Sequence, residues 1–569
     1  MSIRSIVALL LVLTVAGCAS SQQAAGPPEG TSNPPSSSET VETTDDRSSS
    51  PDQETEAAAE EGVATDWFHF DAEGATPGMS TDKAYRTLLD GRAPKDTVVV
   101  AIIDSGIDID HEDLQSVIWT NDDEVPGNGV DDDQNGYVDD VHGWNFIGGP
   151  DGENVEYDTF ELTRLYTQYR ERFADVDSAD VPPSEQEAYA RYQQLQSEFN
   201  EERQQAQQQL QSVRQAHRAV QSATATLKNH LQTDALSQDV VASVASPDQQ
   251  VERAKSILMY FYQQGLAPSD IAEYHEYLQQ QVEYNYNPDF NPRPIVGDDY
   301  SDKTGRIYGN NDVTGPDAEH GTHVAGIVGA ARGNGIGIDG VATGVRIMSI
   351  RAVPNGDERD KDVANAIRYA ADNGADIINM SFGKSYSPHK SVVDAAVQHA
   401  DSLGILMVHA AGNDGANVDS TESYPTGQYE EGGEAGLWIT VGASSPSRGA
   451  ELAAPFSNYG AETVDVFAPG GEIYSTMPGN DYGRNSGTSM AAPMVSGLAA
   501  LIMAYHPELP PAQVRSLILE SATPFGEMEV TVPGGTRTVP FATLSQTGAI
   551  VNVYAALQRA MRSSSDQLD

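Results

Sequence analysis

The chain has 569 residues and a mass of 60.8 kDa, which is too long for one small domain. Hydrophobic residues make up 39% of it and charged residues 21%, so wholesale disorder is excluded. Acidic residues outnumber basic ones by 84 to 33. The resulting net charge of -51 would repel phosphate backbones, and we therefore expect no nucleic-acid partner.

The same acidic excess is typical of proteins from high-salt habitats, where salt ions screen the repulsion between surface carboxylates. We therefore hypothesise a halophilic protein whose stability depends on salt. An ordinary acidic secreted protein is the alternative.

The N-terminus has the layout of an export signal. Arg4 precedes the apolar run Ile6–Val15, which is too short to span a membrane, and the run closes at Cys18. It resembles a bacterial lipoprotein signal, which implies a signal peptide over residues 1–18. Cys18 would then be lipidated and would anchor the exported protein to the membrane of the cell envelope, at the outer membrane or cell surface. Ordinary cleavage after Ala19 and a buried cysteine are the alternatives.

Cys18 is the only cysteine of the chain. No disulfide within the chain and no cysteine-ligated metal cluster can therefore form. Residues 19–61 are mostly Ser, Thr, Pro, Gln and acidic residues, with almost nothing apolar to bury. Such a composition cannot offset the entropy lost on ordering, so we predict a disordered tether between the anchor and the folded body.

Strands and helices alternate after order begins near Trp67. The apolar run Thr97–Ile103 has the length of a buried strand. Similar runs lie at 345–350, 377–380, 405–410, 437–441 and 464–467, and helical spacing lies at 320–331, 360–373, 392–403 and 489–505. This alternation predicts an α/β fold with a mostly parallel sheet covered by helices on both faces. We expect it to be formed by residues 62–150 and 284–562, followed by a short tail over 563–569.

A long helical segment interrupts this rhythm. Residues 184–246 contain neither Gly nor Pro, so a long helix can run without a breaker. Apolar residues recur every seven positions at Tyr192, Phe199, Ala206, Val213, Val220 and Leu227, and a second stripe is partly filled by Leu195, Ala216 and Ala223. This pattern is typical of a coiled-coil seam.

Further helical pieces at 251–264 and 270–281 extend the segment, so we predict a helical insertion over residues 151–283 that folds back on itself. Two interpretations stay open. The insertion is either an antiparallel hairpin that packs its own seam, or an arm that binds a protein partner or regulates the body.

Three motifs carry candidate chemistry. Asp104-Ser-Gly-Ile-Asp108 follows a predicted strand, at the edge where open α/β sheets build their sites. His320-Gly-Thr-His-Val-Ala-Gly326 opens a helix. Gly487-Thr-Ser-Met-Ala-Ala-Pro493 places a hydroxyl beside backbone N–H groups at another helix start, where they can stabilise an oxyanion. Each motif alone could be structural, the serine only an N-cap. Their occurrence together, in the order Asp, His, Ser, argues against that.

With these motifs the chain resembles the subtilisin-like serine proteases, whose Asp-His-Ser triad follows this order on a parallel α/β sheet. The resemblance covers residues 96–147 and 308–557. It implies a three-layer α/β/α fold and a serine endopeptidase that cuts polypeptides through an acyl-enzyme intermediate. Ser489 would be the nucleophile, His320 the general base and Asp104 the group that orients it, while His323 would be structural.

The resemblance also assigns the surroundings of the triad. Asn413 would donate its side-chain amide to the oxyanion, unless it was chosen for turn geometry. The substrate-binding segments would be Ser381, Phe382 and Gly383, which pair with an extended peptide as an added strand, and Ala410, Ala411 and Gly412. Since Ala and Gly leave the pocket walls small, we expect an apolar or aromatic residue before the cut.

An acidic loop precedes the insertion. Residues 121–140 hold eight carboxylates and no Lys or Arg. Oxygen-bearing side chains alternate at Asp131, Asp133, Asn135 and Asp139, an arrangement that can wrap a calcium ion. His142 stands where an EF-hand would end in Glu, so this would be a single loop site. An acidic, salt-adapted loop is the alternative.

No organic cofactor is indicated. Residues 335–340 match a dinucleotide pattern but follow a helix and precede a strand, which is the reverse of the required context. No His-Glu-x-x-His stretch supports a zinc protease.

Two features depart from the family pattern. Relatives usually separate the catalytic Asp and His by a few tens of residues, whereas here the insertion lies between them. It could restrict substrate size, bind a partner or hold the enzyme inactive. The stretch 19–61 is too polar for a folded inhibitory prosegment, although residues 62–96 could supply a small covering segment. The alternative function is a binding or assembly protein that uses the insertion and carries a vestigial catalytic site.

Overall fold

The structure is a computed structural model that describes residues 63–566. The predicted signal peptide, Cys18 and the tether lie outside these residues. The described chain divides into two compact units. The larger unit comprises residues 65–211 and the described residues from 267 onwards. The smaller unit comprises residues 212–266 and, among the described residues, also 63 and 64.

A sheet forms the centre of the larger unit, and nine strands belong to it within the described residues. Their order is β10, β13, β7, β6, β5, β4, β1, β3 and β2. Every adjacent pair is parallel except β10 and β13. The strands are β1 (Val98–Asp104), β2 (Gly143–Asn145), β3 (Val345–Arg351), β4 (Ile377–Met380), β5 (Leu406–Ala410), β6 (Trp438–Ser444), β7 (Val466–Pro469), β10 (Thr523–Pro524) and β13 (Ala549–Ile550).

The predicted mostly parallel sheet is thus confirmed. β1 lies between β3 and β4, with Val100 opposite both Ile347 and Ile377. Its residues from Val100 to Asp104 are buried, which explains why the strand reads as a continuous apolar run. The strands β2, β10 and β13 were not predicted, because two or three residues are too few to show a period.

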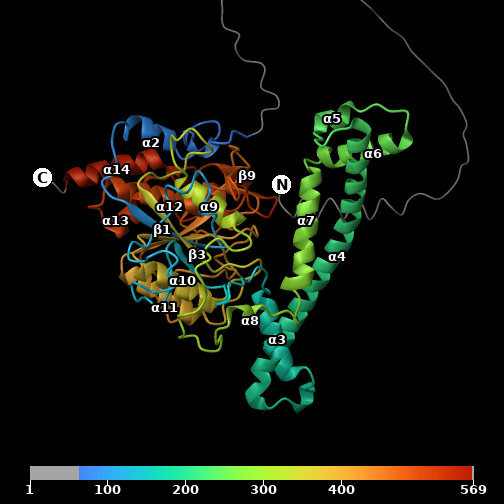
Figure 1. Cartoon of the computed structure of the whole chain (residues 1–569), viewed down its shortest axis with the longest axis horizontal. Helices are drawn as coiled ribbons and strands as arrows, with labels where there is room; N and C mark the ends of the chain where they lie inside the picture. Colours follow the sequence, from blue (N-terminus) through green and yellow to red (C-terminus); the bar gives the residue numbers. More distant parts are fainter. Residues whose placement is uncertain (1–62, 567–569) are drawn as a thin grey trace, which may run out of the picture. The chain divides into compact units, whose positions relative to one another are not determined.

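Helices cover both faces of this sheet. On one face lie α10 (Asp360–Asp372) and α11 (Lys390–Ser402), which share a core cluster with alternate residues of β1, β3 and β4. On the other face lie α9 (Glu319–Gly329) and α12 (Thr488–Tyr505), as Figure 1 shows. By length and composition α12 is apolar enough to cross a membrane, but it is buried in the protein core.

The helices α13 (Pro511–Ser521), α14 (Val553–Asp566) and α2 (Thr81–Thr87) complete this layer. The helix α14 runs to Asp566, into the stretch predicted as a tail. Its buried face, which includes Ala556, Leu557 and Ala560, anchors the helix to the body, so its last turn can continue.

Two hairpins lie outside the central sheet. One pairs β8 (Ile473–Met477) with β9 (Asp481–Asn485), and the other pairs β11 (Glu529–Thr531) with β12 (Thr538–Pro540). Short 3-10 helices lie at Trp67–His69, Ser178–Asp180, Pro183–Glu185 and Phe541–Thr543.

Most of the residues between Glu161 and Asn285 are helical, in agreement with the predicted helical segment. The larger unit contains α3 (Glu161–Phe173), α7 (Pro268–Gln280), the π-helical turn η4 (Gln281–Asn285) and α8 (Arg293–Val296). The smaller unit contains α5 (Gln238–Ser243) and α6 (Gln249–Gln263). One helix of 46 residues, α4 (Gln186–Leu231), contributes to both units. Residues 151–160, which we assigned to the insertion, form no helix.

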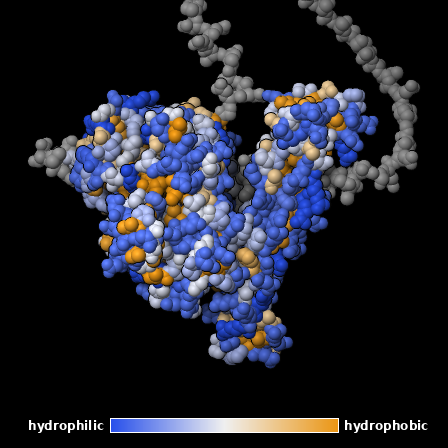
Figure 2. Space-filling model, viewed as in Figure 1, coloured by the Kyte–Doolittle hydropathy of each residue, from blue (hydrophilic) through white to orange (hydrophobic). Residues whose placement is uncertain are grey.

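The heptad stripe of α4 is its buried stripe. In the larger unit Tyr192, Phe199 and Ala206 are buried in a cluster with aromatic residues of α3 and with Tyr286. The rings of Tyr166 and Phe199 stack with centroids 4.3 Å apart. In the smaller unit Val213, Val220 and Leu227 are buried as well. On the face shown in Figure 2, α4 presents mainly hydrophilic residues.

Candidate active site

The first two motifs meet at the carboxyl end of β1. Asp104 is the last residue of that strand and is 1% exposed, and His320 is the second residue of α9. The Nδ1 atom of His320 donates to the Oδ1 atom of Asp104 at 2.7 Å, while the imidazole as a whole is 40% exposed. Since Nδ1 carries the proton of this bond, Nε2 is the basic atom of the neutral ring.

The Asp104 carboxylate also shifts the titration of His320. Partial removal from water lowers the pKa of His320, but the charge and hydrogen bond of Asp104, together with the charges of Asp317 and Glu319, outweigh this effect. The net result is a pKa above the ordinary value of 6.5. The ring therefore holds a proton more readily than a free imidazole, which suits a group that takes up and returns protons.

Glycine lets α9 approach β1 closely. A Cβ at Gly321 would lie 2.1 Å from the carbonyl oxygen of Gly106 and 3.2 Å from the Cβ of Asp104. The backbone N–H of Asp108 then donates to the Oγ1 of Thr322 at 2.8 Å. The two motifs are thus joined by backbone contact as well as through the His320 side chain.

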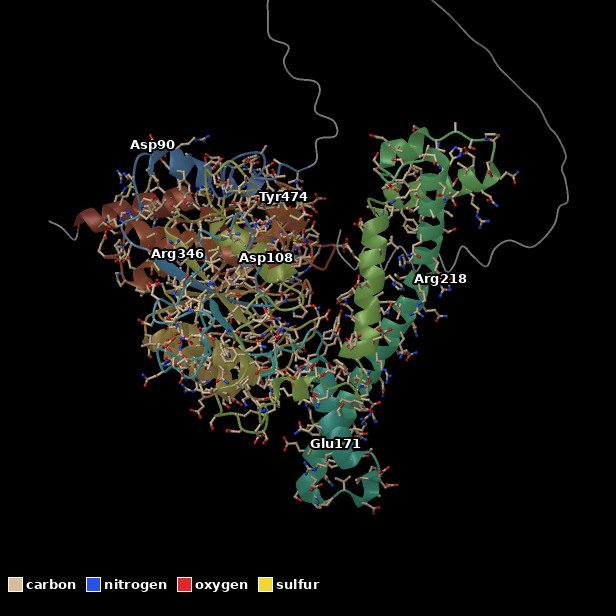
Figure 3. All side chains as sticks on the ribbon, in the orientation of Figure 1. Asp90, Asp108, Glu171, Arg218, Arg346 and Tyr474 are labelled. Carbon is tan, nitrogen blue, oxygen red and sulfur yellow. The ribbon has the colours of Figure 1, made fainter. Side chains whose placement is uncertain are left out.

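The hairpin strand β8 holds α9 from the other side. Ser475 donates to the carbonyl of His323 at 2.7 Å, and Thr476 donates to the carbonyl of Thr322 at 2.7 Å. Asp108 and Tyr474, at this end of the body, are labelled in Figure 3. Sequence reasoning missed both hydroxyls. The sequence signal that could have indicated them is the strand-like run of residues 473–477 before a Pro-Gly-Asn turn, a pattern that is typical of a hairpin.

His323 is buried, and its Nε2 atom lies 3.0 Å from the carbonyl oxygen of Ile473. Burial lowers the pKa of His323 to about 4, so its ring is neutral at ordinary pH. These contacts favour the structural role that the resemblance implies for it.

Ser489 is the second residue of α12 and is 9% exposed. Its hydroxyl donates to the carbonyl of Ser381 at 3.0 Å, and the Ser381 hydroxyl donates back to the carbonyl of Ser489 at 2.8 Å. The hydroxyl is therefore bonded to a predicted substrate-binding segment and not to the imidazole. The hydrogen bond between a nucleophile and its general base is often formed only when substrate is bound.

The side chain of Asn413 is oriented by Thr488. Its Oδ1 atom accepts hydrogen bonds from the backbone N–H of Thr488 at 2.8 Å and from the Thr488 hydroxyl at 3.0 Å. Its amide nitrogen bonds to no residue in the described part of the chain, so it is free to donate to a ligand. Thr488 lies inside the third motif, but its role as a positioning residue was not predicted.

A cleft of about 530 Å³ joins these parts, and all its lining residues belong to the larger unit. It is lined by Ser489 and Asn413 and by the predicted substrate-binding residues Ser381, Phe382, Gly383, Ala410 and Gly412. Ala411 does not line it, because its side chain is 2% exposed and packs in the core with Leu452 and Phe467.

The insertion contributes to the same cleft. Its lining residues there are Phe160, Leu162, Glu198, Glu202 and Gln281, and Tyr286, which follows the insertion, lines the cleft beside them. None of them was predicted from the sequence. In the sequence Glu198 and Glu202 look like ordinary solvated positions of a long helix.

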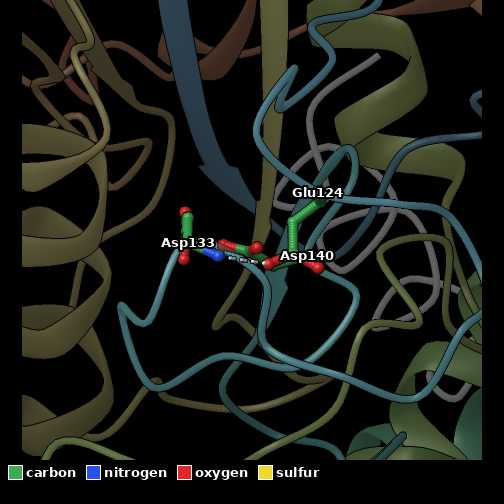
Figure 4. Close-up of side chains that lie close together, drawn as sticks. All are labelled: Glu124, Asp133 and Asp140. Carbon is green, nitrogen blue, oxygen red and sulfur yellow. Dashed lines mark hydrogen bonds between the residues drawn. The ribbon is translucent and has the colours of Figure 1, made fainter.

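The acidic loop brings three carboxylates together. Glu124, Asp133 and Asp140 each offer an oxygen within 4.8 Å of the others (Figure 4). Glu124 is 6% exposed, and its Oε2 atom has no hydrogen-bond partner among the described residues. Burial raises the pKa of Glu124, and the charges of Asp140 and Asp133 raise it further. This arrangement offers oxygen ligands of the kind that a hard cation prefers.

Only Asp133 of the predicted metal residues lies in this cluster. Asp131 accepts backbone N–H groups of Asn135 and Gly136, and Asp139 accepts those of Asn128 and Gly129. Asn135 directs its amide nitrogen to Asp133 and Asp140, each at 3.0 Å. Glu124 and Asp140 were missed as ligands, although both belong to the acidic run that marked the loop.

Comparison with known proteins places these features in context. The profile of the Subtilase family matches residues 95–549. A thermophilic serine proteinase of Bacillus sp. strain AK1 is 42% identical over 223 residues, which are 39% of this chain and 49% of that protein. A subtilisin of Bacillus pumilus is 41% identical over 213 residues, 37% of this chain and 72% of that protein.

The chain spans about half the length of the first of these curated relatives. Among solved structures, a protease of Pseudoalteromonas arctica PAMC 21717 aligns with a TM-score of 0.36 and 29% identity. That alignment covers 44% of this chain and 78% of the other.

Proposed function

The chain belongs to the subtilase family, and from this premise we propose that it is a serine endopeptidase that uses Asp104, His320 and Ser489 to hydrolyse peptide bonds of proteins. The observation that carries the proposal is the 2.7 Å bond between His320 and Asp104, made at the edge of the sheet where parallel α/β folds build their sites. The cleft that contains Ser489 supplies room for a polypeptide.

In the first half of the reaction, the Ser489 hydroxyl leaves the carbonyl of Ser381 and gives its proton to Nε2 of His320 as Oγ attacks the scissile carbonyl. Asp104 stabilises the imidazolium that forms. The oxyanion of the tetrahedral intermediate accepts a hydrogen bond from the amide of Asn413, which Thr488 holds in place.

In the second half, His320 passes the proton to the leaving amine, and the acyl group stays on Ser489. Water then attacks the acyl-enzyme with His320 again as base, and the acid product is released. The raised pKa of His320 stabilises the imidazolium in both halves.

We also propose that the acidic loop binds a structural calcium ion through Glu124, Asp133 and Asp140. The buried, unpartnered Oε2 of Glu124 supports the proposal, because a carboxylate removed from water needs a cation or a donor. Calcium should raise the melting temperature of the protein but not of Glu124→Gln, and equal response of the two proteins would contradict the proposal.

We further propose export and lipid anchoring through Cys18, at the outer membrane or cell surface. The support is the sequence pattern of residues 1–18. Mass spectrometry of the N-terminal peptide from native membranes should find a diacylated or triacylated Cys18. An unmodified N-terminus at another residue would refute it.

The proposed activity is tested by labelling with a fluorophosphonate probe. Wild-type protein and Ser489→Ala are compared in low and high salt, with and without calcium. Labelling that depends on Ser489, together with hydrolysis of casein, is expected. Absence of both in every condition would reject the peptidase and favour the binding or assembly protein with a vestigial site.

A further inference from the structure

The root of the insertion forms one wall of the active-site cleft. Phe160 and Leu162 come from the start of the insertion, Glu198 and Glu202 from α4, and Tyr286 from the segment that directly follows the insertion. They line the same cleft of about 530 Å³ as Ser489. All of these residues lie in the larger unit, so the wall is part of one compact body.

This wall is bonded to the substrate-binding side of the cleft. The hydroxyl of Tyr386, which follows the Ser381–Gly383 segment closely, lies 2.7 Å from each carboxylate oxygen of Glu198. The hydroxyl of Tyr286 donates to Glu202 at 3.4 Å. The ring of Tyr286 packs edge-on against Phe160, with centroids 5.0 Å apart. These contacts hold both carboxylates toward the cleft.

The cleft is strongly acidic. Five carboxylates line it, namely those of Glu198, Glu202, Asp357, Asp414 and Glu422. The lining cation is Lys384, which is 2% exposed and already bonded to Asp360 and Glu161, so its charge is neutralised within the protein. Desolvation and the neighbouring charges of Glu198 and Glu201 raise the pKa of Glu202. A basic side chain would relieve this repulsion, and an acidic one would add to it.

We propose that Glu198 and Glu202 make the root of the insertion a specificity element, which selects polypeptides with a Lys or Arg side chain on the acyl side of the scissile bond. This inference rests on the proposed peptidase function and deepens it. The acyl side follows from Tyr386, which connects Glu198 to the segment on which an acyl-side strand would lie.

This specificity differs from the apolar or aromatic preference expected from the small residues of the two binding segments. Those segments contribute the near walls, whereas Glu198 and Glu202 lie almost two hundred positions away from them in the sequence. The sequence alone does not indicate that α4 lies beside the cleft.

The experiment uses full-length protein and fluorogenic peptides that differ only by Arg, Gln, Leu or Glu at each of four acyl-side positions. Enzyme concentrations are set by fluorophosphonate titration. Wild type should cleave an Arg peptide about tenfold better than its Gln counterpart at one or more positions, through KM. Glu198→Gln and Glu202→Gln should each reduce this ratio about three- to tenfold, since partly exposed charges contribute modestly. Glu201→Gln, on the same helix but not lining the cleft, should not reduce this ratio.

A second readout does not require turnover. Calorimetry on Ser489→Ala should show tighter binding of the Arg peptide than of the Gln peptide, and adding Glu198→Gln should remove the difference. Equal Arg-to-Gln ratios in wild type and both Gln variants, or equal binding of the two peptides, would overturn the inference. If the protein labels with the probe but shows such equal ratios, the proposed peptidase activity stands and only the proposed selectivity is rejected. Selective binding without labelling would instead reject the peptidase.

Discussion

The candidate catalytic edge, where α9 meets the end of β1, and the root of the insertion, which lines the cleft with Ser489, are built by different means. At the edge, α9 meets β1 through glycine backbone, with a virtual Cβ at Gly321 only 2.1 Å from the Gly106 carbonyl. Neutral hydroxyls of Thr322, Ser475 and Thr476 make the remaining links. This edge tolerates little displacement, because its parts are already in contact.

The root relies on charge instead. Lys384 lies 2.7 Å from Asp360 of the body and 3.2 Å from Glu161 of the insertion. Arg293, which lies just after the insertion, is 2.6 Å from Asp362 of the body. Burial opposes ionisation of Glu161, but Arg164 and Lys384 outweigh it and lower its pKa to about 2.

This contrast separates two tasks. Steric contact fixes the reacting groups, whereas a network of buried ion pairs fixes where the insertion leaves and re-enters the body. Buried pairs add little net stability but strongly disfavour any arrangement that leaves a charge unpaired. The chemistry of the cleft and the selection of its substrates should therefore fail under different perturbations.

The largest effect is expected from Asp104→Asn. Loss of the carboxylate should lower kcat about 10⁴-fold, the size found when the triad carboxylate of a serine protease is made neutral. It should also move the pH profile. Because His320 must be neutral to act as base and its pKa lies above 6.5, kcat/KM of the wild type should rise with pH through a midpoint above 6.5.

In Asp104→Asn that midpoint should fall, since the group that raises the pKa of His320 is gone while desolvation remains. The full profile of residual activity between pH 5 and pH 9 provides the measurement. An unchanged midpoint would show that another group sets the titration.

The same contrast explains what the sequence could predict. The edge is encoded by contiguous motifs, so the parallel sheet could be predicted from local residues, and Asp104, His320 and Ser489 could be named as candidates. The wall at the root of the insertion could not be predicted in this way, because no residues near Glu198 and Glu202 in the sequence indicate that α4 lies beside the cleft. The acidic loop is intermediate. Its alternating oxygen-bearing side chains allow the loop to be recognised in the sequence. The structure shows that Asp131 accepts backbone N–H groups instead of joining the carboxylate cluster, and the fold determines which carboxylates come together.

A second prediction concerns the stability of the root. Lys384→Met leaves the carboxylates of Glu161 and Asp360 buried without their ammonium partner, so unfolding free energy should fall by about 3–5 kcal/mol. Lys83→Met is the matched control. It breaks the Lys83–Asp71 pair, whose side chains are 42% and 44% exposed, and it should change stability by about 0–1 kcal/mol.

Urea unfolding of the three proteins gives these differences, and equal losses in the two variants would contradict the account. Acid provides a further check. Because the pKa of Glu161 is depressed, its contribution is present above its ordinary pKa of 4.5 and is lost as pH falls towards 2. The difference in unfolding free energy between wild type and Lys384→Met should therefore become smaller at low pH.

A third prediction returns to the edge. Asn413→Ala removes the proposed oxyanion donor and should lower kcat by about 10²–10³-fold, or about 2.7–4 kcal/mol of transition-state stabilisation, with KM nearly unchanged. Asn417→Ala, which alters an exposed asparagine of the following loop, serves as the control and should keep full activity. A large change in KM with constant kcat would assign Asn413 to substrate binding instead.

The smallest effect is expected from salt, and it tests the two regions together. With a net charge of -51, surface carboxylates repel one another, and raising NaCl from 0.1 M to 1 M shortens the screening length from about 10 Å to about 3 Å. The melting temperature of the wild type should rise by several degrees, since a gain of 1 kcal/mol moves it about 2–4 °C in domains of 150–250 residues. Lys83→Met should rise in parallel with it. Lys384→Met should keep its lower melting temperature at every salt concentration, because the carboxylates that lose their ammonium partner are buried where mobile ions do not reach. Recovery of that variant in 1 M NaCl would place Lys384 in solvent and remove the electrostatic account of the root.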